Sequence, residues 1–126
     1  MNALEFVGLA DLATMQVATI SQEAKKRVAI ALALATDPKV ILLDEPAAGI
    51  NPEETDGLAE LMKKIVQNGI TVCTIEHKMQ MIMELADQIL VLNHGAKIAE
   101  GTPEEIKTNP TVIEAYLGGE SVAEVI

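Results

Sequence analysis

The chain has 126 residues, of which 49% are hydrophobic and only 2% aromatic, and its formal net charge is −10. This is the length of one domain, and its core has to be built from aliphatic side chains. Binding to nucleic acid is not expected, because a phosphate backbone attracts clustered Lys and Arg and the chain has one short basic cluster, Lys25-Lys26-Arg27.

No apolar run reaches the roughly 18 residues that a membrane-spanning helix needs, so no direct membrane insertion is expected. The amino terminus has no basic region followed by an apolar one, and we therefore expect a cytoplasmic protein. The single cysteine, Cys73, lies in an apolar run and is expected to serve as a small core hydrophobe.

Residues 1–20 show a short, interrupted helical pattern without candidate chemistry. Ser21 then fits the N-cap of a helix over 22–36, because its hydroxyl can accept a free backbone N–H of the first turn, and Asp37-Pro38 ends the pattern. From Val28 onward almost every side chain is apolar, so this helix is expected to be buried around most of its girth.

The next segment, Val40–Leu43, is a continuous aliphatic run typical of a strand that is buried on both faces. Asp44 and Glu45 follow directly, at the carboxyl edge where open α/β sheets bind ligands. Two carboxylates there suit a hydrated Mg²⁺ and a base that activates water. The alternative is that both are solvated loop acids before a helix.

A second helix is expected after Asn51, which is an N-cap followed by Pro52 and by Glu54 three residues after the cap. Its apolar residues recur on one helical face, so it should cover a sheet: Leu58, Leu61, Met62, Ile65 and Val66. Asn68-Gly69 is expected to end it in the left-handed conformation.

A second buried strand, Ile70–Ile75, is followed by Glu76-His77 at its carboxyl end. The pattern then predicts a crossover helix over Met79–Ala86, in which the methionines serve packing, and a strand over Gln88–Leu92. The turn Asn93-His94-Gly95 leads into Ala96–Ala99 as a hairpin, with His94 exposed and without function.

Thr102-Pro103-Glu104-Glu105 predicts a capping box with proline in the first helical position. Asn109-Pro110 starts a last short helix through Tyr116, which Gly118-Gly119 should end, and the tail after Glu120 is expected to fray. Strands that alternate with helices predict an α/β fold with a three-layer parallel sheet, helices on both faces and a carboxyl-terminal antiparallel hairpin strand.

Several of these segments together resemble the carboxyl-terminal half of an ABC-transporter ATPase, a P-loop NTPase-like fold. They are the helix after Ser21, Ile41-Leu-Leu-Asp-Glu-Pro46, Ala48-Gly-Ile-Asn-Pro52 and Ile75-Glu-His77, in this order and spacing. Segments 47–52, 91–95 and 101–106 are similar in detail to ATPase subunits of branched-chain amino-acid importers. The resemblance covers residues 3 to 119.

The resemblance implies ATP and Mg²⁺ as cofactors and a role for each matching residue. Asp44 matches the Walker B aspartate that holds Mg²⁺ through its water shell, and Glu45 matches the general base that polarises the attacking water. His77 matches the switch histidine that contacts the γ-phosphate. Asn51 lies in the D-loop, which runs along a dimer seam, and Ser21 in the signature position that faces a nucleotide.

The family also implies partners: another ATPase chain, or a self-associated copy, and a transmembrane permease. In the parent family the ATPase is peripheral to the inner membrane.

Two departures from the family pattern bear on activity. No Gly-x-x-x-x-Gly-Lys-Ser/Thr, the loop whose backbone and lysine cradle phosphates, occurs in the chain. The signature position reads Ile20-Ser-Gln-Glu-Ala24 instead of the family's Leu-Ser-Gly/Tyr-Gly-Gln, and Leu32 replaces a common arginine. Glu23 favours the helix through its macrodipole but would repel a γ-phosphate, so nucleotide binding should be weak or absent.

The resemblance divides the chain into a remnant of a helical subdomain (1–20), a truncated ATP-binding-cassette core (21–119) and the frayed tail (120–126). In the family the Walker A strand lies between the strands predicted here at 70–75 and 88–92. The simplest expectation is that these two pair directly, giving the strand order 40–43, 70–75, 88–92 and 96–100. The alternative is an open slot, filled by a second chain or left as an exposed sheet edge.

Three functions remain open from the sequence. The chain is a piece of an importer ATPase that cannot hydrolyse ATP alone, a non-enzymatic folding or self-association module (excised or engineered), or one half of an ATPase that a separately encoded amino-terminal half completes.

Overall fold

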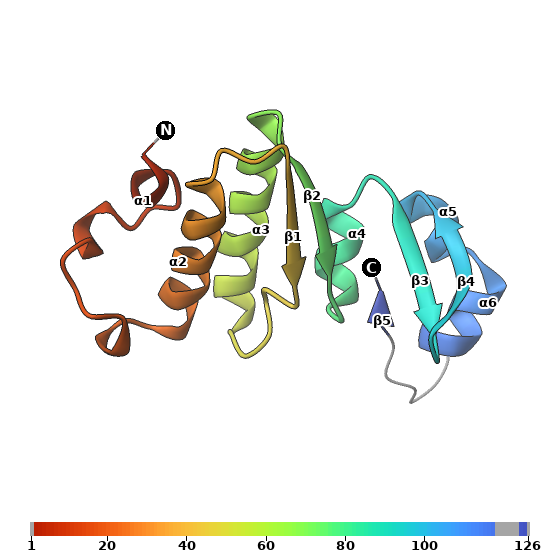
Figure 1. Ribbon diagram of the computed structural model, residues 1–126. Helices are drawn as coiled ribbons and strands as arrows, with labels where there is room; N and C mark the ends of the chain where they lie inside the picture. The colour runs from red at the N-terminus through yellow and green to blue at the C-terminus, as the bar shows by residue number, and fades with distance from the viewer. Residues whose placement is uncertain (1, 118–123, 126) are drawn as a thin grey trace. The chain divides into compact units, whose positions relative to one another are not determined.

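The computed structural model describes residues 2–117 and 124–125, which form two compact units (Figure 1). The first unit comprises residues 1–42 and 47–73, and the second comprises residues 43–46 and 74–126. None of the helices in the described part of the chain is long and apolar enough to cross a membrane.

The first unit holds the amino-terminal helices, one long helix and most of a two-stranded sheet. Its elements are α1 (Ala3–Phe6), η1 (Ala10–Leu12), η2 (Val17–Thr19), α2 (Gln22–Leu34), β1 (Val40–Asp44), α3 (Pro52–Gln67) and β2 (Thr71–Ile75). β1 and β2 pair and run parallel, as predicted (Figure 1). The ends of β1 and β2 continue into the second unit.

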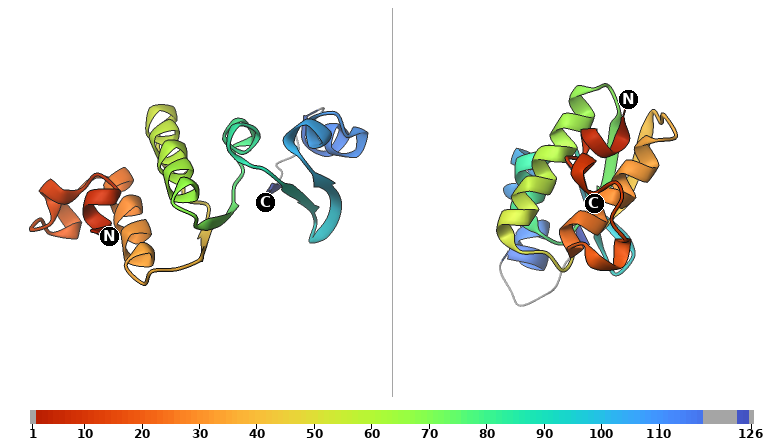
Figure 2. Two further views of the ribbon diagram at one scale, coloured as in Figure 1. Left: turned by 90° about the horizontal axis from the view of Figure 1, so that it is seen from above. Right: turned by 90° about the vertical axis from the view of Figure 1, so that its left-hand side faces the viewer.

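Helix α3 has the predicted caps and the predicted single apolar face. Asn51 and Glu54 form a reciprocal capping box, and Gly69 takes a φ of +85° just after the helix. The buried side chains of α3 include Leu58, Leu61, Met62 and Ile65, whereas Val66 is exposed. The helix lies on one face of the β1–β2 pair (Figures 1 and 2).

The other face of the β1–β2 pair is bare, which makes the expectation of a strand buried on both faces wrong. Only Ile41 of β1 is fully buried, whereas Val40 is 54% and Leu42 77% exposed. Cys73 of β2 is also exposed, so it is not the core hydrophobe that its apolar neighbours suggested. The prediction of helices on both faces therefore fails for this pair, because no described element of the first unit lies over these side chains.

Helix α2 begins after Ser21 as predicted but is not buried around its girth. Its buried residues are confined to one side, Ala24, Ile30, Ala31 and Leu34, and Leu32 is 73% exposed. A run of Ala, Leu and Ile has no helical periodicity that would indicate which side of the helix packs. The prediction from the sequence therefore overestimated how many side chains of α2 are buried.

Short polar contacts hold α1 against the longer helices of the first unit. Arg27 of α2 donates from Nη1 to the Val7 carbonyl at 2.9 Å. Lys64 of α3 donates from Nζ to the Phe6 carbonyl at 2.7 Å, and its ammonium lies 4.1 Å from the centre of the Phe6 ring. A cation over an aromatic face adds a further attraction, so residues 2–9 are anchored at two points.

The second unit contains a three-stranded sheet with short helices. Its elements are α4 (Met79–Leu85), β3 (Ile89–Asn93), β4 (Ala96–Gly101), α5 (Pro103–Lys107), α6 (Pro110–Val112), η3 (Ile113–Leu117) and β5 (Glu124–Val125). The strand order is β4-β3-β5, with both pairings antiparallel. His94 and Gly95 both have positive φ, +48° and +78°, which is the geometry of a tight two-residue hairpin turn.

An aliphatic core closes the second unit. Its buried members are Ile82, Ile89, Val91, Ala99, Ile106 and Val112. Met79 and Met83 pack against this core and Met81 is buried, so the prediction that the methionines serve packing is confirmed. The Tyr116 hydroxyl donates to the Leu92 carbonyl, which ties η3 to the sheet.

The predicted direct pairing of the second and third strands is wrong. β2 and β3 belong to different sheets, and β3 is paired on one edge with β4 and on the other with β5. β5 pairs only with Val91 and Leu92, so this edge of β3 is partly occupied by a strand of the same chain, and the alternative of an open slot filled by a second chain stays a prediction. The expected helix end at Gly118-Gly119 and residues 120–123 and 126 of the tail lie outside the described residues, whereas Glu124–Val125 pair with β3, so the prediction of a frayed tail is wrong for these two residues.

Candidate functional site

Glu45 lies at the carboxyl end of β1 in an unusual backbone conformation. Its N–H donates to the Ile75 carbonyl at 2.8 Å, which extends the β1–β2 ladder by one bond. Its φ is +48°, in the left-handed region that costs a non-glycine residue roughly 1–2 kcal/mol. This backbone strain occurs at a residue whose side chain makes a specific contact.

That contact is with His77, which follows the end of β2. The Glu45 carboxylate meets Nε2 of His77, and the side chains are 40% and 36% exposed, respectively. Both residues belong to the second unit, so the tertiary structure joins two groups that lie at the ends of two strands. A carboxylate and an imidazole in contact at a half-open sheet edge can orient each other and exchange a proton with a bound water.

Asp44 is exposed at the last position of β1, beside this pair in the sequence. Within residues 2–117 and 124–125 no group of three or more His, Cys, Asp and Glu side chains could hold a metal ion. Mg²⁺ keeps several waters and is bound through one or two carboxylates together with substrate phosphates. Asp44 therefore fits one ligand position of such an ion, and the described residues alone do not complete the site.

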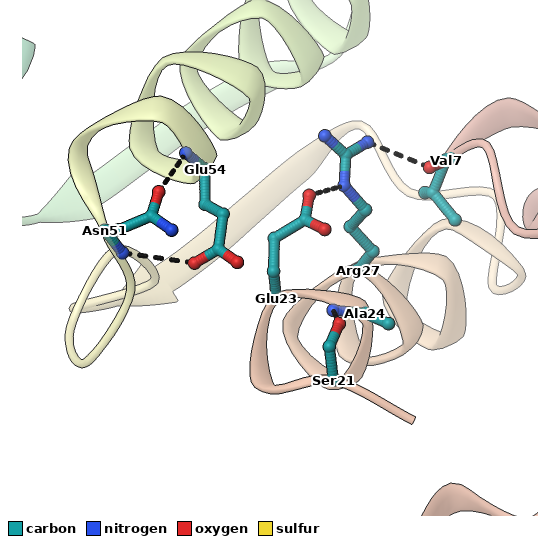
Figure 3. Close-up of polar contacts among 7 residues, drawn as sticks. All are labelled: Val7, Ser21, Glu23, Ala24, Arg27, Asn51 and Glu54. Atoms are coloured by element: carbon teal, nitrogen blue, oxygen red, sulfur yellow. Dashed lines mark hydrogen bonds and ion pairs between the residues drawn. The ribbon is translucent and has the colours of Figure 1, made fainter. Parts of the chain in front are cut away.

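Ser21 acts as the N-cap of α2, as the sequence predicted. Its Oγ accepts a hydrogen bond from the Ala24 N–H at 3.1 Å (Figure 3). Two residues on, the Glu23 carboxylate pairs with Nε of Arg27, and the two side chains are 23% and 18% exposed. The Arg27 guanidinium also reaches the Val7 carbonyl, so the Glu23 charge is compensated inside the first unit (Figure 3).

Asn51 is likewise engaged in a helix cap. Its Oδ1 accepts from the Glu54 N–H at 2.8 Å, and its own N–H donates to a Glu54 carboxylate oxygen at 3.1 Å (Figure 3). Ser21 and Asn51 belong to the first unit and the Glu45–His77 pair to the second. Of the predicted site residues, the structure thus brings Glu45 and His77 into contact. Ser21 and Asn51 belong to the other unit.

Three polar residues near these positions were not recognised from the sequence. Arg27 looked like part of a basic cluster, but its guanidinium is an internal link between α2 and the chain at Val7. Glu76 is only 2% exposed, and the buried Thr74 hydroxyl has no hydrogen-bond partner among the described residues. The alternation of β2 suggests that Thr74 faces inward, but nothing in Ile-Glu-His indicates a buried carboxylate.

Comparison with protein families matches both ends of the chain. The ABC transporter family model matches residues 1–48, and the model of the branched-chain amino acid ATP-binding cassette transporter matches residues 96–122.

Curated relatives agree with these two matches. The high-affinity branched-chain amino acid transport ATP-binding protein BraF of Pseudomonas aeruginosa is 46% identical over 116 residues, covering 91% of this chain and 46% of the relative. The chain belongs to the ATP-binding proteins of ABC transporters, branched-chain amino acid type. The corresponding protein LivG of Escherichia coli K12 is 43% identical, with the same shares covered.

Solved structures place the same fold over nearly the whole chain. An ATP-binding cassette of an ABC transporter in its ADP conformation has a TM-score of 0.84 and 32% identity, covering 93% of this chain and 48% of that one. A nucleotide-free ATP-binding cassette gives 0.83 and 34%, with the same shares covered. The chain therefore spans about half the length of the ABC family members it matches.

Proposed function

We propose that these 126 residues are the carboxyl-terminal half of the ATP-binding subunit of an ABC importer for branched-chain amino acids, and that they supply the hydrolytic pair of its ATPase site. The pairing of Glu45 with His77 carries the proposal, because it unites the two residues that the family resemblance assigns to water activation and γ-phosphate contact. The similarity to BraF and LivG, whose names specify branched-chain amino acid transport, supports the substrate class.

In this proposal each side chain has one task. As general base, Glu45 accepts a hydrogen bond from the attacking water. His77 holds the Glu45 carboxylate in place and approaches the γ-phosphate. Asp44 holds Mg²⁺ through its water shell; the ion, when bound with ATP, neutralises phosphate charge. Phosphoryl transfer depends mainly on positioning and charge neutralisation, so isolated carboxylates are not sufficient for it.

The residues Ser21 and Asn51 are proposed to face nucleotide from helix N-termini, where backbone dipoles favour anions. Their side chains already cap α2 and α3, so their backbone positions are well defined. The carboxylate of Glu23 in the same turn is paired with Arg27, which lowers its repulsion of a phosphate but leaves no glycine for close approach.

Because these 126 residues contain no phosphate loop, we expect them to be inactive by themselves. Phosphate release by the chain with Mg²⁺ and ATP should equal that of the Glu45→Gln variant, which keeps the shape of the side chain but not its basicity. Release well above this control would contradict the claim of inactivity. In calorimetry with Mg²⁺ and nucleotide we expect no binding, or at best millimolar affinity, about −4 kcal/mol.

The catalytic assignment is tested by co-expressing the chain with the amino-terminal half of BraF, the portion this chain does not match. The mixture should hydrolyse ATP, and Glu45→Gln or His77→Ala should lower the rate by about 100-fold or more, as expected for loss of a general base or its partner. A Lys97→Ala variant, exposed on β4 in a pair with Glu100, is the control and should keep full activity. Unchanged rates in both site variants would overturn the assignment.

In the full system the proposed partners are a second ATPase chain and a transmembrane permease, with the ATPase at the cytoplasmic side of the membrane.

A further inference from the structure

We infer that Arg27 is a positioning residue of the proposed nucleotide site, and that it acts through Glu23 by holding the carboxylate of that residue inside the first unit. In this position the Glu23 charge does not oppose a nucleotide at the amino-terminal end of α2. The inference rests on the proposed function for the nucleotide, and on the geometry of the first unit for the place of the two side chains.

Glu23 is the residue that needs a partner. It lies in the first turn of α2, two residues after the N-cap Ser21. A carboxylate in this turn is stabilised by the helix dipole, but it has the same sign as a phosphate that binds there. A guanidinium in contact with the carboxylate offsets most of that repulsion, because opposite charges at contact distance attract strongly.

The guanidinium of Arg27 is held by two groups of the first unit. Its Nε contacts the Glu23 carboxylate, and its Nη1 donates to the Val7 carbonyl at 2.9 Å (Figure 3). Val7 is itself only 1% exposed, so this carbonyl belongs to a packed segment. The guanidinium therefore cannot move away from Val7 without losing a hydrogen bond.

Gly57 provides the space that this arrangement requires. It lies in the interior of α3, where glycine is less favourable than alanine, and its φ is not positive, so the backbone does not require a glycine. A Cβ at this position would lie 3.1 Å from Nη2 of Arg27, closer than the usual van der Waals contact of 3.4–4 Å. The glycine thus lets the Arg27 guanidinium lie directly against α3.

The same contact links the two helix ends that are proposed to face nucleotide. Arg27 is the sixth residue after Ser21, and Gly57 is the sixth residue after Asn51. The helices α2 and α3 therefore approach each other at the same distance along the chain from their N-caps. Arg27 positions the Glu23 charge and the start of α2 with one side chain.

The contact with Gly57 is tested in the chain alone with Gly57→Ala. In an Arg27→Met background the alanine should raise the folding equilibrium constant by about two- to fivefold, which is the helix preference of Ala over Gly. In the parent chain the same substitution should give no gain, because the added Cβ displaces the guanidinium. Urea denaturation measures both. An equal gain in the two backgrounds would overturn the inference.

The position of the Glu23 carboxylate is tested by labelling carboxylates with a carbodiimide and an amine, followed by mass spectrometry. Arg27→Met should accelerate labelling of Glu23 by about fivefold or more, since the carboxylate then loses its partner and becomes accessible. The control is Lys63→Met, which removes the exposed pair with Glu60. Labelling of Glu60, which is already 72% exposed, should change by less than about twofold.

The role toward nucleotide is tested in the complex with the amino-terminal half of BraF. Arg27→Met should raise the KM for MgATP by about fivefold or more and keep kcat within about twofold, because an uncompensated charge weakens binding rather than the chemical step. Adding Glu23→Gln should restore KM, since it removes the charge that Arg27 offsets. Lys63→Met should leave both constants unchanged. Circular dichroism fixes a temperature at which every variant is folded.

The outcomes separate this inference from the proposed function. Unchanged labelling of Glu23 in Arg27→Met would overturn the inference. A raised KM that Glu23→Gln does not restore would also overturn it, because the role of Arg27 would then be stability alone. An inactive complex with the parent chain, together with the expected labelling and the expected Gly57→Ala results, would count against the proposed function and still support the position of Glu23 inside the first unit.

Discussion

The two units of the chain differ in how completely they bury the aliphatic side chains of their strands. The second unit gathers Ile82, Ile89, Val91 and their neighbours into a closed core that its own helices complete. The first unit buries one side of its sheet under α3 and leaves Val40 and Leu42 exposed. Because both use strands of similar composition, the difference shows that an apolar strand is buried only as far as the elements around it extend.

The largest effect is expected when the same kind of side chain is truncated in each unit. Ile89→Ala removes a fully buried side chain and should lower the free energy of unfolding by about 3 kcal/mol, since it leaves a cavity as well as losing transfer energy. Leu42→Ala removes an exposed side chain and should change it by less than about 0.5 kcal/mol. Urea denaturation followed by circular dichroism measures both. Similar losses would show that the exposed face of the β1–β2 pair is covered in solution.

A smaller effect is expected from the internal ion pair of the first unit. Arg27→Met keeps most of the apolar stem but removes the contacts with Glu23 and the Val7 carbonyl, and should cost about 1–2 kcal/mol. Lys63→Met removes an exposed pair with Glu60 and should cost no more than about 0.5 kcal/mol. Hydrogen exchange of residues 3–9 should accelerate in the Arg27 variant only. Equal behaviour of the two variants would mean that the Arg27 link does not hold the amino-terminal segment.

The smallest effect compares the same cap in the two units. Asn51→Ala removes the cap of α3 and Thr102→Ala that of α5, and each should cost about 1 kcal/mol, because each leaves a helix N–H without its side-chain acceptor. Denaturant midpoints measure the loss. As controls, Asn51→Ser and Thr102→Ser keep an oxygen in place and should stay within about 0.5 kcal/mol of the parent chain. A clearly larger loss at Asn51 than at Thr102 would show that the first unit depends more on local interactions than the second.

Local structure was largely predictable from the sequence. The caps at Ser21, Asn51 and Thr102 and the left-handed end at Gly69 are confirmed, because each depends on a few neighbouring residues. The regular spacing of apolar residues in α3 was also sufficient to predict its buried side, since it places these residues on a single helical face.

Burial was harder to predict wherever the residue pattern had no period. Val40–Leu43, the apolar part of α2 and the segment around Cys73 all looked buried, and each has exposed side chains. Such apolar runs indicate that their side chains prefer an apolar environment. They do not indicate whether another part of the chain provides that environment. Of the candidate site, the sequence identified Glu45 and His77, while their contact across two strands required the fold.

The sequence by itself determined where the longer helices and the strands β1 to β4 lie and which family the chain resembles, because caps, turns and motifs are short and local. Only the tertiary structure decided that Glu45 meets His77, that β3 uses both edges for β4 and β5, and that one face of β1 and β2 stays open. These depend on pairing between distant segments, and no local preference specifies which distant segments meet.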